Sequence, residues 1–92
     1  MIISFSHQGL ERFFRKGVTS GIQAKHARKV GRILHALDNA EQPKDMDVPG
    51  FKLHQLKGNR KNIWAVSVNA NWRVTFGFKG QNALTVNYED YH

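Results

Sequence analysis

The spacing of apolar residues changes along the chain, from a helical period in the first part to strict alternation in the second. Leu10, Phe13 and Phe14 fall at positions i, i+3 and i+4, which places them on one face of a helix. Ser6 belongs to the residue types that cap helix N-termini, and Gly17 is a favourable stop. This stretch therefore predicts a short amphipathic helix between Ser6 and Gly17.

A second and longer helix is predicted from Ser20 to about Leu37. Ser20 and Gln23 have the spacing of a capping box, in which each side chain bonds the other residue's backbone N–H. Apolar residues then recur at intervals of three and four along one face, at Ala27, Val30, Ile33, Leu34 and Leu37. The opposite face is either solvated or a surface for RNA or an acidic partner segment. It carries Lys25, Arg28, Lys29 and Arg32.

The rest of the chain follows a polar connection at residues 38–49, which holds both prolines, and it alternates between apolar and polar residues. Such alternation has the period of a strand. The expected strands cover residues 2–5 at the N-terminus and then 51–54, 63–68, 72–78 and 84–89. Short turns between the later runs favour an antiparallel meander. The predicted fold class is therefore α+β, with a short N-terminal strand and two helices packed on one face of an antiparallel sheet, in a single domain over residues 1–92.

Composition narrows the class of protein and its partners. The chain has 92 residues and no cysteine, which fits a small cytoplasmic domain without disulfides. It shows neither a signal peptide nor an apolar run of membrane-spanning length, so no membrane partner is expected. The 14 Lys and Arg residues outnumber the 7 Asp and Glu residues and give a formal charge of +7. This excess makes nucleic acid the first candidate partner and an acidic protein the second.

Positive charge is separated from negative charge in the part of the chain where the strands are predicted. No acidic residue lies between Val48 and Tyr88. The same span contains His54 and the cations Lys52, Lys57, Arg60, Lys61, Arg73 and Lys79. Such a purely basic sheet is suited to bind phosphates.

Strand alternation predicts which side chains share the face away from the helices. Lys52, His54 and Arg73 have the parity opposite to their apolar neighbours and are expected to converge there. Thr75 and Gly77 follow Arg73 on that face, and their small size is expected to leave room for a ligand. The last run is expected to bury Leu84, Val86 and Tyr88 on the other face.

The chain ends in a cluster of acid–base groups, Asp90, Tyr91 and His92, directly after the last expected strand. RNA carries its own nucleophile, the 2′-hydroxyl, so a protein that cleaves it has to move protons and stabilise a charged phosphorane. Imidazole exchanges protons near neutral pH, which suits His54 and His92 for the acid and base roles in either order. This chemistry requires no cofactor, and the sequence contains no metal-ligand spacing such as HxxxH or CxxC.

Three spaced motifs resemble those of the HigB toxins in the RelE/HigB superfamily, namely LHQLKG at residues 53–58, NWRVTF at 71–76 and NYEDYH at 87–92. The resemblance covers essentially the whole chain. It implies the RelE-like microbial RNase-type fold and a ribosome-dependent endoribonuclease that cuts mRNA in the ribosomal A site. It also implies a HigA-type antitoxin as partner, with contact to operator DNA through the toxin–antitoxin complex.

The resemblance further implies roles for individual residues. The positions associated with activity are those of His54, Asp90, Tyr91 and His92. The positions associated with phosphate and RNA contact are those of Lys57 and Arg73, and the basic residues Lys52, Arg60 and Lys61 extend this set. Asp90 would orient a histidine and favour its protonated form, whereas Tyr91 would stack on a base or bond the phosphate.

Two other functions stay open from the sequence. A non-catalytic basic module that binds RNA or protein would need the basic face but not His92. A gyrase-directed toxin of the same fold, as in the related ParE group, would have no use for acid–base groups around a phosphate. The combination of His54, Arg73 and the terminal cluster therefore favours the nuclease.

Overall fold

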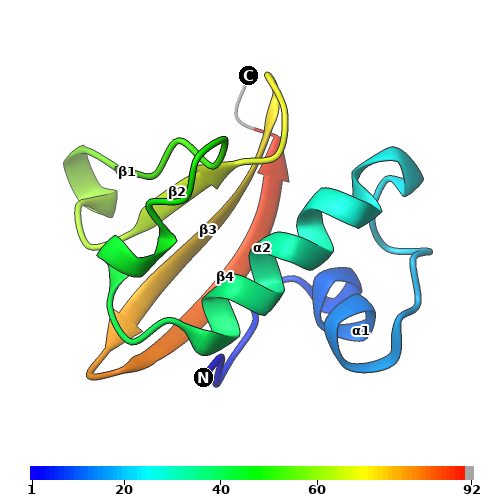
Figure 1. Ribbon diagram of the computed structural model, residues 1–92, viewed down its shortest axis with the longest axis horizontal. Coiled ribbons are helices and arrows are strands. Elements are labelled where there is room, and N and C mark those ends of the chain that lie inside the picture. Colours follow the sequence, from blue (N-terminus) through cyan, green and yellow to red (C-terminus); the bar gives the residue numbers. More distant parts are fainter. Residues whose placement is uncertain (91–92) are drawn as a thin grey trace.

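The alternating half of the chain forms a four-stranded antiparallel sheet, and α2 crosses one of its faces (Figure 1). The computed structural model describes residues 1–90. The strands lie in the order β1 (His54–Gln55), β2 (Trp64–Ser67), β3 (Trp72–Lys79) and β4 (Asn82–Asp90). The helices are α1 (Gln8–Lys16) and α2 (Ala27–Asn39), with short 3-10 helices η1 (Ala24–His26), η2 (Pro43–Met46) and η3 (Gly58–Arg60). The predicted meander and α+β class are confirmed.

The first helix is capped by His7 and not by Ser6. The His7 ring nitrogen Nδ1 accepts the backbone N–H of Leu10 at 2.9 Å, which satisfies one of the unpaired donors of the first turn. Ser6 lies one residue too early, and its own N–H bonds the carbonyl of Val86. The predicted stop is confirmed, because Gly17 adopts φ 71° and its N–H bonds the Phe13 carbonyl at 2.9 Å.

The second helix begins later than predicted, at Ala27, and continues to Asn39. The capping box is wrong, since Gln23 precedes η1 and makes no side-chain cap bond. A close backbone contact between Gly21 and Gly9 of α1 holds the residues before Gln23 in a turn. The predicted buried face is confirmed at Val30, Ile33, Leu34 and Leu37. Within residues 1–90, no helix is both long and apolar enough to cross a membrane.

The predicted opening strand is reduced to two isolated parallel bridges, Ile2 to Ala83 and Phe5 to Val86. Between them β4 bulges at Thr85, which has φ 49° and shifts the register against β3 between Thr75 and Gly77. Ser4 and Ser6 bond this bulge. The Thr85 N–H donates to Ser4 Oγ at 2.8 Å, and Ser6 Oγ donates to the Thr85 carbonyl at 3.4 Å.

The bulge makes the expected parity of the last strand wrong at Leu84. Leu84 does not share a face with Val86 and Tyr88, because the extra residue reverses the alternation between them. Leu84 instead packs over Gly77 on the opposite face, whereas Val86 and Tyr88 are buried in the core at 0% and 4% exposure.

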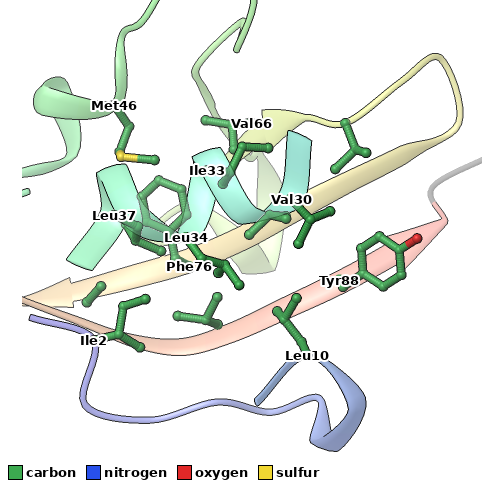
Figure 2. Packing of buried hydrophobic residues seen from close by; sticks show 14 of the residues in the cluster. Ile2, Leu10, Val30, Ile33, Leu34, Leu37, Met46, Val66, Phe76 and Tyr88 are labelled. Carbon is green, nitrogen blue, oxygen red and sulfur yellow. The ribbon is translucent and has the colours of Figure 1, made fainter. Parts of the chain in front are cut away.

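The core lies between the helices and the covered face of the sheet. Figure 2 shows Leu34 from α2 beside Phe76 of β3, and Leu10 from α1 beside β4, all within one apolar cluster. Met46 of η2 closes one end and is fully buried, so the polar connection after α2 contributes to the core. Tyr88 lies near the end of β4 with its hydroxyl at the margin of this cluster (Figure 2).

Candidate active site

The strand register places His54, Arg73 and Glu89 on the sheet face away from the core. His54 opposes Ala65, which opposes Thr75 of β3, so these residues form one row across the sheet. Arg73 opposes Glu89 of β4 in the next row. Residues directly opposite in an antiparallel pair project to the same side. The prediction that His54 and Arg73 share this face is therefore consistent with the register.

A carboxylate that sequence reasoning did not single out joins two of the predicted cations. Glu89 Oε1 accepts Arg60 Nη2 at 3.0 Å and Arg73 Nε at 3.2 Å. The Arg73 side chain is only 14% exposed and that of Arg60 is 44% exposed. Glu89 thus ties the loop that carries Arg60 to the sheet and fixes the Arg73 guanidinium. The sequence did contain one indication of this role for Glu89. Glu89 directly follows Tyr88, which was expected to face the core, so strand alternation turns the Glu89 side chain outward.

His54 is exposed on β1, and a backbone contact sets its tautomer. Its Nδ1 lies 3.0 Å from the Lys52 carbonyl. Because a carbonyl oxygen only accepts, Nδ1 carries the hydrogen, and Nε2 of the neutral ring is the basic nitrogen. The imidazole is therefore oriented by Lys52 with its basic nitrogen directed elsewhere.

Lys52 does not follow the expected strand parity. β1 covers only His54 and Gln55, and Lys52 adopts φ 55°, a conformation uncommon for a residue other than glycine. Its side chain lines a hollow of about 400 Å³ at the edge of the sheet, together with Lys29, Gly50, Ser67, Asn69 and Ala70. Lys29 Nζ donates to the Gly50 carbonyl at 3.1 Å, so one cation of the basic helix face also anchors this edge.

The space expected beside Arg73 is filled. Thr75 is 2% exposed, and Gly77 is buried as well. A Cβ built on Gly77 would lie 3.7 Å from both Ile63 Cδ1 and Leu84 Cδ1. The prediction of an open surface over Thr75 and Gly77 is wrong, because the bulge turns Leu84 onto this face and the loop before β2 brings Ile63 over it.

The loop between β1 and β2 presents the remaining predicted cations. Lys57 and Lys61 flank η3, and both are exposed, as is Arg60 within it. The loop is tied down at its base, where the Gln55 amide donates to the Lys61 carbonyl and the Leu56 N–H bonds the Ile63 carbonyl. It therefore forms an ordered basic rim next to the Arg73–Glu89 pair.

The terminal cluster is only partly described. Asp90 is the last residue of β4 and opposes Trp72. Strand alternation gives it the parity of Tyr88, opposite to that of Arg73 and Glu89. Tyr91 and His92 lie outside the described residues. Among residues 1–90, no group of three or more His, Asp or Glu side chains is placed to hold a metal ion.

A second polar cluster lies on the core side of the same strand ends. His26 is 4% exposed, and its Nδ1 lies 2.6 Å from the Tyr88 hydroxyl. Its Nε2 lies 2.8 Å from Asn69 Nδ2, and the Gln23 N–H donates to the Tyr88 hydroxyl at 3.4 Å. Burial, helped by the charge of Lys25, lowers the pKa of His26 below that of a free imidazole. Burial raises the pKa of Tyr88, and the Gln23 N–H opposes this rise.

Comparisons with known proteins agree with this architecture. The family model for the RelE-like toxin of type II toxin–antitoxin system HigB matches residues 3–92. A protein named Endoribonuclease HigB from Proteus vulgaris is 46% identical over 92 residues, which are 100% of both chains.

Solved structures share the fold at low sequence identity. A YoeB/ParE toxin from Agrobacterium tumefaciens aligns over 100% of both chains with a TM-score of 0.62 and 15% identity. The YoeB-YefM complex from Staphylococcus aureus aligns with a TM-score of 0.59 and 16% identity, over 100% of this chain and 98% of that one. These two structures confirm the predicted RelE-like fold. The family model and the full-length relative show that the chain belongs to the HigB-like family of RelE-like toxins of type II toxin–antitoxin systems.

Proposed function

We propose that this toxin is an endoribonuclease that cuts mRNA in the ribosomal A site and so inhibits translation. The observation that carries the proposal is the 46% identity to Endoribonuclease HigB over all 92 residues. The geometry supports it, because an oriented imidazole, a fixed guanidinium and a basic rim lie on the sheet face away from the helices.

The proposed reaction uses the 2′-hydroxyl of RNA as nucleophile. His54 Nε2, which is the basic nitrogen of the neutral ring, is placed to take or deliver a proton. Arg73 stabilises the negative charge that develops on the phosphorane, and its bond to Glu89 keeps the guanidinium oriented before substrate binds. His92 serves as the second acid–base group, Asp90 orients a histidine, and Tyr91 stacks on a base or bonds the phosphate.

The flanking cations would bind the RNA backbone on either side of the cleaved bond. Lys57, Arg60 and Lys61 form the rim on one side. The hollow that Lys52 and Lys29 line lies at the edge of the sheet and contains no carboxylate among its lining residues. Phosphate contacts of this kind position RNA without reading its sequence.

Partners follow from the family and from the charge. A type II toxin has an antitoxin partner, and we propose one of the HigA type, with operator DNA contacted through the complex of the two. The ribosome and its mRNA are the proposed target. The formal charge of +7 favours association with ribosomal RNA, and we place the chain in the cytoplasm, where ribosomes are.

The experiment is single-turnover cleavage of mRNA on programmed ribosomes by His54→Gln and His92→Gln, with His35→Gln as the control. His35 is exposed on α2, away from the proposed site. Loss of a general acid or base should slow cleavage by about 100-fold or more, while the control retains full activity. If both variants cleave as fast as the control, the proposed acid–base roles are wrong.

A further inference from the structure

The cluster beneath the candidate active site has one consistent hydrogen-bond arrangement. Asn69 Oδ1 accepts the backbone N–H groups of Asn71 at 2.9 Å and Trp72 at 3.0 Å. Backbone N–H groups only donate, so this end of the amide is the oxygen and Nδ2 faces His26. His26 Nε2 must then accept, and its Nδ1 donates to the Tyr88 hydroxyl at 2.6 Å. The arrangement requires a neutral His26.

The same cluster forms a closed set of contacts that joins His26, Asn69, Trp72 and Tyr88 across two strands. Trp72 and Tyr88 stack with ring centroids 4.5 Å apart and planes 27° apart. His26 bonds Tyr88 directly and reaches Trp72 through Asn69. The segment before α2 is therefore attached to the end of β4 and to the start of β3 at once.

These two strand ends carry the proposed site on their other face. Arg73 directly follows Trp72, and Glu89 directly follows Tyr88. Successive residues of a strand point to opposite faces, so Trp72 and Tyr88 lie on the face of the sheet opposite to the Arg73–Glu89 ion pair. A shift of Tyr88 or Trp72 would move the backbone on which that pair is held.

We propose that His26 is a positioning residue of the nuclease: in its neutral form it holds Tyr88 and Trp72, and thereby keeps Arg73 and Glu89 in place on the opposite face. The inference rests on the proposed function. Protonation of His26 would place an N–H at Nε2 opposite the Asn69 amide N–H. Two donors cannot hydrogen-bond each other, so the contact between His26 and Asn69 would break. Among residues 1–90, the titratable groups on the elements around it include Lys25 on its own segment, Tyr88 and Asp90 of β4, which share one parity, and His7 before α1, whose ring lies edge-on to Tyr88 at 5.6 Å.

A test that does not depend on RNA cleavage follows the pH titration of His26 by NMR in the unmodified chain. The Arg73 Nε–H and Glu89 amide signals should move with the same midpoint as the His26 ring, and that midpoint should lie below the usual value of about 6.5. In Tyr88→Phe, which keeps the stacking on Trp72 but lacks the hydroxyl, the Arg73 signal should no longer follow His26. An Arg73 signal that ignores the His26 titration in the unmodified chain would overturn the proposal.

The kinetic test measures kcat and KM on programmed ribosomes against pH, for the unmodified chain and for His26→Gln and His35→Gln. His26→Gln should lower kcat about tenfold at neutral pH with KM unchanged, since the reacting groups are displaced and not removed. On the acid side, kcat should fall more steeply with decreasing pH in the unmodified chain and the control than in His26→Gln, because the variant lacks the proton uptake that breaks the contact of His26 with Asn69.

An unchanged kcat, or an acid-side fall in His26→Gln as steep as that of the control, would contradict the positioning role. If the unmodified chain does not cleave RNA at all, the proposed function fails. The NMR titration still decides in that case whether His26 controls the Arg73–Glu89 pair.

Discussion

At the scale of single residues, the orientation of two arginines on the outer sheet face depends on Glu89, one carboxylate bonded to both guanidinium groups. Exposed ion pairs contribute little to stability, but Arg73 is largely buried, and its orientation matters for the phosphate contact proposed for it. We infer that Glu89 acts by aligning Arg73 for the phosphate, at the expense of one unit of positive charge near the RNA.

Replacing Glu89 by Gln should separate orientation from charge. Glu41→Gln is the matched control, because Glu41 is an exposed carboxylate in the connection after α2 and its replacement changes the net charge equally. Glu89→Gln should lower kcat about tenfold while RNA binds at least as tightly, since a misplaced guanidinium loses transition-state stabilisation. The same kcat for both variants would show that Glu89 does not orient Arg73.

His26 gives the fold a pH dependence whose sign follows from its lowered pKa. The unfolded chain takes up a proton on this imidazole near pH 6.5, while the folded chain resists protonation to lower pH. The contribution of His26 to the free energy of unfolding should therefore be constant above about pH 7 and should decrease as the pH falls through about 6.5. Urea denaturation between about pH 8 and pH 5 should show a smaller decrease for His26→Gln than for His35→Gln. An equal decrease in the free energy of unfolding in both variants would contradict a buried neutral His26.

The residue pattern predicted part of this site. The shared face of His54 and Arg73 could be predicted, because strand alternation depends only on the order of neighbouring residues. Glu89 and His26 were missed because their partners are remote in the chain, 16 residues away for Arg73 and 62 residues away for Tyr88. Lys52 was misplaced because its left-handed backbone interrupts an otherwise alternating run.

At the scale of elements, the two helices and the meander were predictable from periodicity, but their boundaries were not. The start of α1 depends on the His7 ring, and the start of α2 depends on the contact between two glycines. The bulge at Thr85 depends on bonds to Ser4 and Ser6 at the other end of the chain. Tertiary contacts of this kind override local propensity.

The glycine contact between α1 and the following turn should control stability. A Cβ on Gly9 would lie 2.7 Å from Gly21 Cα, which leaves no flexible side chain to move aside. Gly9→Ala should therefore destabilise the fold by about 1–3 kcal/mol, although alanine favours helices. Gly31→Ala in α2 is the control, because its Cβ would meet Phe13 Cζ at an ordinary 3.7 Å and should stabilise by up to about 1 kcal/mol. Thermal unfolding distinguishes the two, and equal shifts in melting temperature would refute the account of this contact.

At the scale of the whole molecule, the two faces of the sheet have different surroundings. One face packs on α1 and α2 and forms the core, as the ribbon in Figure 1 shows for α2. The other face carries His54, Arg73 and Glu89, with the basic rim beside them. The carboxylates of the chain are largely kept out of the strands, with Glu89 engaged by two arginines. Such a basic surface would attract any RNA, so selectivity for mRNA must come from the place where the toxin meets it, which we propose is the ribosome.

Dependence on the ribosome is the central claim that follows from this division, and mRNA cleavage with and without programmed ribosomes tests it most directly. The purified chain should cut within the A-site codon when ribosomes are present, with 5′ ends mapped to that codon, and should leave free mRNA intact. Equal cleavage of free mRNA would contradict ribosome dependence. Absence of cleavage in both conditions, by folded protein, would contradict the nuclease itself and favour a binding module or a gyrase-directed toxin.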